Sequence, residues 1–273
     1  MTALTRAVRS ELLKFFTTRL WWGLAIGVFA SAALFALLFG ILYTSQSFLE
    51  QSGGGPFGGQ VVADDVQIAN TVYTAGLGVG YLLMLVIGVI QIGAEYRHRT
   101  VTSTFLTQPH RPRVMLGKVL ALVLIAAAYG ALSLVGSVLV GSVTLRARGA
   151  EAFPSAEVVR TLALSLLVLG LWALIGLGAG ILIRNQVAAL LITVGVAWIV
   201  EPLAGLAISA WDFGQHHIAP YLPSAATQAV LNGAQASADD VRLSWWGGAI
   251  ALAAWAAAFA LTGIVRVVRQ DIS

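Results

Sequence analysis

The chain contains no cysteine and few charged residues. Asp, Glu, Lys and Arg make up 10% of its 273 residues. The missing thiols exclude disulfide bonds and thiolate metal ligands. Soluble domains carry about 25% charged residues, so this low charge and a hydrophobic fraction of 58% are typical of a membrane protein.

Catalytic motifs are also missing. The sequence has no G-x-x-x-x-G-K-[ST] phosphate loop, no H-E-x-x-H and no G-x-S-x-G. The four histidines lie outside the long apolar runs, which argues against a metal or haem site within a membrane. The adjacent pair His216-His217 is typical of a solvated loop. We therefore expect no metal site, no cofactor bound to this chain, and no enzyme activity of its own.

Long uncharged runs are what the sequence does have. A helix needs roughly 20 apolar residues to cross a bilayer core of about 30 Å. We predict an all-α integral membrane protein whose single transmembrane domain covers residues 20–266, followed by a cytoplasmic tail at 267–273. The predicted spans are 20–43, 72–94, 119–145, 161–183, 187–209 and 243–265.

Residues 1–19 favour an amphipathic helix that lies along the cytoplasmic membrane surface. Its apolar side chains recur near one face, while Arg6, Arg9 and Lys14 stay in water. The alternative is an ordinary basic flank of the first span. The apolar face consists of Leu4, Val8, Leu12, Phe15 and Phe16.

The loop charges predict the orientation. Twelve of the sixteen Lys and Arg residues fall in the N-terminal segment, the 95–118 loop, the turn at Arg184 and the C-terminus. An excess of Lys and Arg marks the cytoplasmic side. Both termini are therefore expected in the cytoplasm, with the loops 44–71, 146–160 and 210–242 outside.

The loop 95–118 is the longest polar segment between two spans on the predicted cytoplasmic side. Its middle is nearly uncharged, and Phe105 and Leu106 have no lipid face to occupy there. Exposed apolar side chains ringed by polar ones are typical of an anchor in a partner's pocket. We expect this loop to dock a soluble protein.

Small residues recur at helical spacing within three predicted spans. G-x-x-x-G pairs permit close approach of helix backbones in lipid. We expect these glycines to pack helices, and the pair in the first span to serve in self-association. The pairs are Gly23/Gly27, Gly76/Gly80 and Gly176/Gly180.

Glu201 is the ionisable residue within an apolar run. Intramembrane carboxylates are costly and usually face a cavity or a partner helix. Pro202 removes a backbone donor and kinks or breaks the helix at this point. Glu201 and Pro202 are thus candidates for an outer gate, the alternative being that the helix ends at Val200 and leaves Glu201 among the headgroups.

These features together resemble the permease subunit of an ABC type-2 exporter. The shared pattern is a surface helix, six spans, a loop opening E-Y-R-x-x-T after the second span, and a P-Y-L-P-S-A string before the last. Here these strings are Glu95–Thr100 and Pro220–Ala225.

The resemblance implies a permease of the bacterial plasma membrane that pairs as a homodimer, or as a pseudo-dimer with a related permease. Two copies of a separate ATPase would carry the ATP and Mg²⁺, and no nucleic acid would be bound. The 95–118 loop would form the coupling helix, through Glu95, Tyr96, Arg97, Thr100, Thr104, Phe105, Leu106, Pro109 and Arg111. The nearly uncharged spans favour an amphiphilic or apolar cargo.

Two other classes remain open from the residues alone. A secondary transporter or channel would need coupling carboxylates or an inverted repeat within its spans. The chain offers Glu201 and no convincing repeat. A membrane anchor for a cytoplasmic complex would use the same loop without transporting anything.

Overall fold

The structure is a computed structural model, and it describes residues 3–45, 65–97, 111–183, 185–231 and 242–269. These residues form helices and connecting turns, with no β-strand among them, so the predicted all-helical fold is confirmed. Six helical segments are long and apolar enough to cross a membrane, as the sequence predicted. They are Leu20–Thr44, Asp65–Glu95, Pro112–Ala147, Ala156–Leu182, Gln186–Ser209 and Trp245–Arg266.

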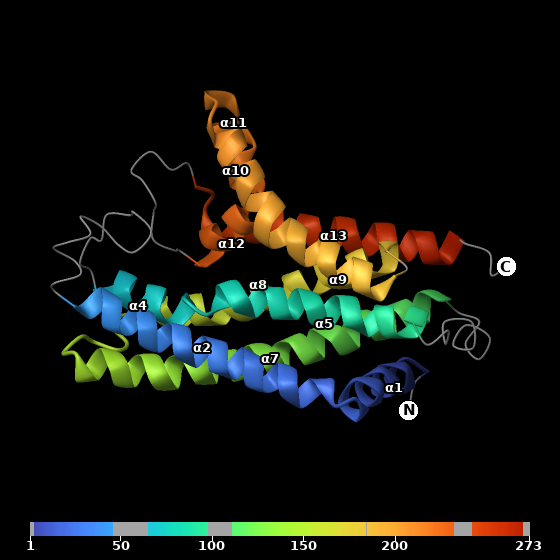
Figure 1. Ribbon diagram of the computed structural model, residues 1–273, viewed down its shortest axis with the longest axis horizontal. Coiled ribbons are helices and arrows are strands. Elements are labelled where there is room, and N and C mark those ends of the chain that lie inside the picture. Colours follow the sequence, from blue (N-terminus) through green and yellow to red (C-terminus); the bar gives the residue numbers. More distant parts are fainter. Residues whose placement is uncertain (1–2, 46–64, 98–110, 184, 232–241, 270–273) are drawn as a thin grey trace.

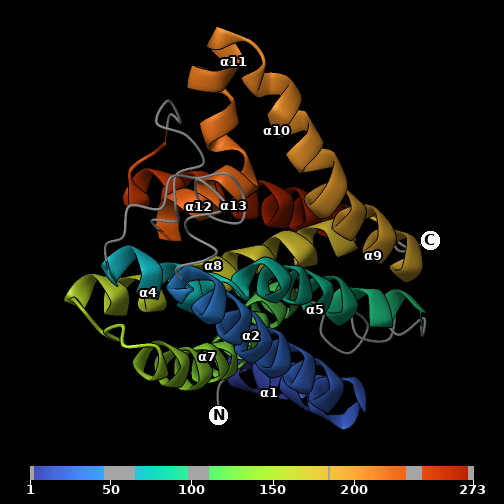
Figure 2. The ribbon, with the colours of Figure 1, turned by 60° about the vertical axis from the view of Figure 1, so that its left-hand side comes forward.

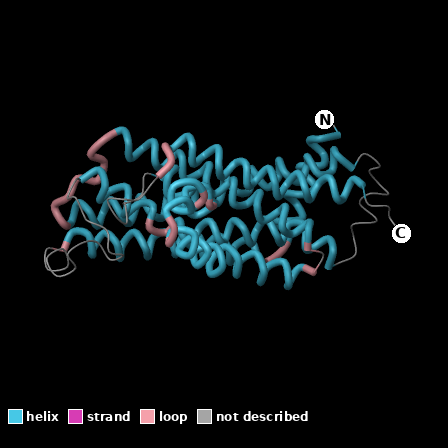
Figure 3. Tube along the Cα trace, turned by 90° about the horizontal axis from the view of Figure 1, so that it is seen from above, coloured by secondary structure: helices cyan, strands magenta, loops and turns pink. Residues whose placement is uncertain are grey.

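The long helices run side by side along the longest axis of the molecule (Figures 1 and 3). They are α2 (Leu20–Thr44), α5 (Leu77–Arg97), α7 (Arg111–Ala147), α8 (Ala156–Leu182) and α13 (Trp245–Arg269). Helix α8 lies at the centre, because it contacts α5, α7 and α13 and is the most buried of the six spans. A helix that is apolar on all sides is expected in such a position.

The second span is interrupted near its N-terminal end. A short helix, α4 (Asp65–Thr74), is followed by a turn and then by α5, which begins at Leu77. The turn lies tightly against α2, since a Cβ at Gly76 would come 2.6 Å from the Cα of Ala32. The sequence predicted that this span begins at position 72. The helical segment begins earlier, at Asp65, because α4 also includes the more polar residues before position 72.

The third span is longer than the bilayer requires. Helix α7 begins at Arg111, well before the expected start at Val119, and has 37 residues. At about 1.5 Å per residue this is roughly 55 Å, against a bilayer core of about 30 Å. Helix α7 is therefore long enough for its first turns, which carry charged side chains, to extend beyond the apolar layer.

The fifth span continues past Val200, the residue at which one of the two sequence-based alternatives placed its end. Helix α9 (Gln186–Gly195) passes into a π-helical turn (Val196–Val200) and then into α10 (Glu201–Ser209). The wide turn fits the sequence, because Pro202 lacks an N–H and its ring would clash with the carbonyl one α-turn earlier. Helix α10 slants away from the bundle (Figures 1 and 2).

The chain then returns to the bundle through short helices within the predicted outer loop 210–242. They are α11 (Asp212–His217), a 3-10 turn (Ala219–Tyr221) and α12 (Pro223–Leu231), which packs on α13. The carbonyl oxygen of Tyr221 accepts a hydrogen bond from Trp255 Nε1 of α13 at 2.9 Å. The P-Y-L-P-S-A string thus covers the last two residues of the 3-10 turn and the start of α12.

Large apolar side chains remain exposed on the outer helices. This pattern is expected where a helix faces acyl chains, because lipid is as apolar as the side chains it meets. The exposed set on α2 and on the segment α9–α10 includes Trp22, Ile26, Leu34, Leu191, Trp198, Leu203 and Leu206.

Candidate functional site

Helix α1 (Ala3–Thr17) lies against the start of α7. Its buried residues are Ala7, Glu11 and Phe15, spaced four apart along one face. The ring of Phe15 packs edge-on against Tyr129 of α7, with centroids 5.9 Å apart. Phe15 is thus buried against α7, whereas Phe16, from the same predicted apolar face, is 44% exposed.

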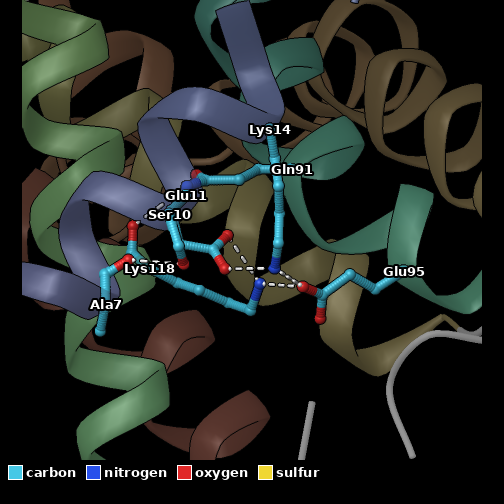
Figure 4. Close-up of polar contacts among 7 residues, drawn as sticks. All are labelled: Ala7, Ser10, Glu11, Lys14, Gln91, Glu95 and Lys118. Carbon is cyan, nitrogen blue, oxygen red and sulfur yellow. Dashed lines mark hydrogen bonds and ion pairs between the residues drawn. The ribbon is translucent and has the colours of Figure 1, made fainter. Parts of the chain in front are cut away.

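Four charged side chains from three helices meet between α1, α5 and α7 (Figure 4). Lys118 Nζ of α7 lies 2.8 Å from Glu11 Oε2 and 2.6 Å from Glu95 Oε1. Lys14 Nζ lies 2.7 Å from Glu11 Oε1 and 2.7 Å from the same Glu95 oxygen. We call these four residues the ion network.

The two lysines of the ion network differ in how deeply they are buried. The side chain of Lys118 is 1% exposed, while that of Lys14 is 49% exposed. Burial lowers the pKa of Lys14, but the hydrogen bonds and charges of Glu11 and Glu95 together raise it by more than burial lowers it. The pKa of Lys14 therefore lies above its ordinary value. Two cations balance two carboxylates, and such pairing is what allows charges to be buried.

A neutral side chain extends the ion network. Gln91 lies one turn before Glu95 on α5, and its Nε2 donates to the backbone carbonyl of Lys118 at 3.2 Å. Gln91 and Glu95 therefore hold the end of α5 to the beginning of α7 through two separate contacts. Both ends of the predicted coupling loop are tied to each other and to α1.

Only some of the predicted coupling residues lie in the part of the chain that the structure describes. Glu95 is in the ion network, Tyr96 and Arg97 lie in the last turn of α5, and Arg111 begins α7. The remaining members lie outside the described residues, namely Thr100, Thr104, Phe105, Leu106 and Pro109.

Glu201 forms a second buried polar site. It is 8% exposed, and its Oε1 accepts hydrogen bonds from the backbone N–H of Ser224 at 2.7 Å and from Ser224 Oγ at 2.6 Å. Ser224 lies in the first turn of α12, where free N–H groups and the helix dipole favour an anion. Glu201 thus caps α12, and its Oε2 is buried without a hydrogen-bond partner among the described residues.

The contacts of α12 continue from this cap towards the centre of the bundle. Thr227, one turn after Ser224, accepts a hydrogen bond from Trp172 Nε1 of α8 at 2.9 Å. Trp172 stacks on Tyr81 of α5, with ring centroids 4.5 Å apart. A polar and aromatic path therefore joins α10, α12, α8 and α5.

The predicted packing glycines occupy different environments. A Cβ at Gly176 would clash with the Leu85 carbonyl of α5, and one at Gly180 would come 2.7 Å from Ile92. A Cβ at Gly80 would meet only side-chain atoms, the nearest at 3.4 Å. Gly23 has no neighbour within 4 Å, and Gly27 meets one side-chain atom at 3.9 Å, so their face of α2 is open. Self-association through that face stays a prediction.

Within the described segments, no three His, Cys, Asp or Glu residues are grouped so that they could hold a metal ion. His216 lies on α11, where its Nδ1 is 2.8 Å from the carbonyl oxygen of Asp212. The ring of His217 stacks on that of Phe213, with centroids 4.7 Å apart. These contacts are local to one short helix.

The sequence reasoning did not identify Glu11, Lys14, Lys118 and Ser224 as site residues. A signal for two of them was present. Lys118 lies on the same helical stripe as Met115 and Leu122, and Glu11 lies between Ala7 and Phe15. A charged residue within an apolar stripe predicts a buried partner of opposite charge.

No protein-family model matches the chain, and no curated protein sequence matches it. The class is defined by the fold, since six apolar helices of spanning length characterise an all-helical, multi-pass membrane protein.

Proposed function

We propose that this protein is the membrane-spanning permease subunit of an ATP-driven exporter, and that the segment between α5 and α7 couples it to a separate ATPase. The observation that carries the proposal is the ion network. Its short contacts join α1 and both ends of that segment. A partner that displaces the segment would displace three helices together.

Helix packing supplies the next step of the mechanism. The backbones of α5 and α8 cross at Gly176 and Gly88, where a Cβ on either glycine would clash with backbone atoms of the other helix. Helix α8 in turn contacts α13 closely at Gly178. A push at the ion network would therefore tilt the bundle as a body, which is how we expect it to alternate between inward-open and outward-open states.

The proposed setting is a bacterial plasma membrane with both termini in the cytoplasm. In support, α1 and the C-terminal end of α13 lie at the same end of the bundle (Figure 1). We place α1 along the cytoplasmic surface as an amphipathic helix. The functional unit would comprise two permeases, identical or related, and two ATPase subunits that carry ATP and Mg²⁺, with an amphiphilic or apolar cargo.

The proposal is tested by the double variant Phe105→Ala/Leu106→Ala. Truncating an apolar anchor commonly costs about 2 kcal/mol of binding, roughly thirtyfold in affinity. We expect normal insertion, weaker co-purification of the partner ATPase, and loss of transport-coupled ATP hydrolysis. Leu139→Ala, at a 56% exposed position of α7 outside the 95–118 loop, is the control. A double variant that binds its ATPase and exports normally contradicts the proposal.

One observation favours a second candidate, a proton-coupled secondary transporter. Glu201 is buried within a span and leaves Oε2 without a partner among the described residues. Intramembrane acids of this kind serve in proton relays. Transport in vesicles that lack any ATPase, driven by a pH gradient and lost in Glu201→Gln, would establish this candidate and exclude the first.

A further inference from the structure

An apolar groove runs between α1 and α7 on the outside of the bundle. Its volume is about 460 Å³, within the range of roughly 300–1,000 Å³ that ligand sites occupy. Helix α1 contributes every fourth residue of one face, and α7 contributes three side chains from one turn. The lining residues are Leu4, Thr5, Val8, Arg9, Leu12, Leu120, Val123 and Leu124.

The two walls of the groove suit an acyl chain. Leu120, Val123 and Leu124 are 37–52% exposed, although they lie within the candidate span that begins at Pro112. Exposed apolar side chains in a membrane span are covered by lipid. The α1 wall, formed by Leu4, Val8 and Leu12, turns this surface into a groove with apolar sides.

The charge beside the groove is positive and uncompensated. The one acidic residue of α1, Glu11, is buried and already paired with Lys14 and Lys118. Arg6 and Arg9 are exposed, and within the described part of the chain neither is paired with an acidic side chain. Arg9 also lines the groove itself. A guanidinium can bind a phosphate through two parallel hydrogen bonds.

We propose that this groove is a binding site for an anionic phospholipid, with one acyl chain between α1 and α7 and the phosphate at Arg9. Two complementarities indicate this occupant. The apolar walls match the chain, and the unpaired arginine at the edge matches the headgroup.

Occupancy of the groove would strengthen the contact between α1 and α7. Leu12 lines the groove and is adjacent in sequence to Glu11, which belongs to the ion network. A lipid that contacts both helices therefore holds Glu11 near Lys118. Since a ligand stabilises the state it binds, anionic lipid should raise the unfolding temperature of the protein.

The test uses the full-length protein, purified in an uncharged detergent and stripped of lipid. Phosphatidylglycerol and phosphatidylcholine with identical chains are titrated in parallel, and binding is followed by the shift in unfolding temperature and by native mass spectrometry. We expect tighter binding of phosphatidylglycerol. Arg9→Gln should weaken that binding roughly fivefold, the contribution of one basic side chain near an anionic headgroup, and leave phosphatidylcholine unaffected.

Two further variants separate headgroup, chain and folding effects. Arg19→Gln removes the same charge at an exposed position outside the groove and should bind phosphatidylglycerol as the unaltered protein does. Leu124→Trp fills the apolar part without changing charge, and should reduce binding of both lipids. The unfolding temperature of each variant without lipid shows whether it is folded.

The outcomes decide the proposal in either direction. Equal affinity for the two lipids would overturn the role of Arg9, as would equal losses from Arg9→Gln and Arg19→Gln. Unchanged lipid binding by Leu124→Trp would overturn the groove as the site. If Leu124→Trp instead changed the oligomeric mass with lipid binding unaltered, the occupant would be a second copy of the chain. None of these results depends on an ATPase partner or on transport.

Discussion

Lys118 is the residue whose position is least expected from its chemistry. An ammonium group is costly to remove from water, yet this side chain is among the largest fully buried ones in the protein. The cost is offset only because carboxylates from two other helices contact the same nitrogen. The residue therefore makes the positions of α1 and α5 depend on each other.

We predict that Lys118→Met destabilises the protein far more than Lys14→Met. Loss of Lys118 leaves carboxylates buried beside an apolar side chain, and breaking a buried pair costs about 3–5 kcal/mol. Lys14 is half exposed, so water can replace it and the cost should stay below about 1 kcal/mol. Thermal unfolding in detergent measures both. Adding Glu11→Gln to Lys118→Met should restore part of the loss, and equal effects of the two lysines would contradict the buried role.

Both hydrogen bonds that Glu201 accepts come from a single residue, Ser224. We predict that Glu201→Ala destabilises the protein by about 1–3 kcal/mol, because the Ser224 N–H and hydroxyl both lose their acceptor in a buried site. Ser224→Ala removes one of the two bonds and should cost less. Chemical or thermal unfolding of the pair tests the order. A larger loss in Ser224→Ala would show that the cap is not what Glu201 contributes.

Packing between elements depends on small residues at a few crossings. The α5–α8 crossing has Gly88 on one helix and Gly176 on the other, each facing backbone atoms of its neighbour. Such contacts let two backbones approach closely in lipid, where apolar burial gives little net attraction between helices. The close fit of the two backbones at these glycines therefore fixes the position of α8 at the centre of the bundle.

We predict that Gly176→Ala lowers the unfolding temperature and the yield of folded protein, because the added methyl group would displace α5 at Leu85. Gly170→Ala is the matched control within the same helix. Its Cβ meets nothing within 4 Å, and alanine favours a helix over glycine by about 1 kcal/mol. Gly170→Ala should therefore unfold at the same or a slightly higher temperature. Similar losses from both variants would mean that glycine acts through helix propensity instead.

The spans themselves could be predicted because a bilayer requires length and apolarity, and both are local properties of a sequence. The contacts of Glu11 and Lys118 could not, since these residues are 107 positions apart and meet only after α1 folds onto α7. Glu201 and the P-Y-L-P-S-A string were each noticed, but their connection through Ser224 depends on how α12 returns to the bundle. Local pattern predicted the elements, and tertiary packing decided which charges meet.

For the molecule as a whole, α1 and the C-terminal end of α13 lie at one end of the bundle, and α4 lies at the other (Figure 1). The last turns of α8 and α13 are joined at that first end too, since Arg266 Nη1 donates to the carbonyl of Leu182 at 2.8 Å. A cation at the C-terminus of α8 is favoured by the helix dipole. Charged contacts between helices are thus concentrated where both described chain ends lie.

We predict that this end is cytoplasmic. The reason is the distribution of Lys and Arg, twelve of which fall in segments on that side and four on the other. Reporter enzymes active only after export should work when fused after Gly59, Gly149 or Gly233, and a reporter active only in the cytoplasm should work at Ser273. Fusions after Gly59 and Gly149 bracket α5 and α7, so activity at both requires the intervening 98–110 segment to face the cytoplasm. Cytoplasmic activity at any two of the three glycine sites would invert the arrangement, and a soluble ATPase could then no longer reach the segment that the ion network braces.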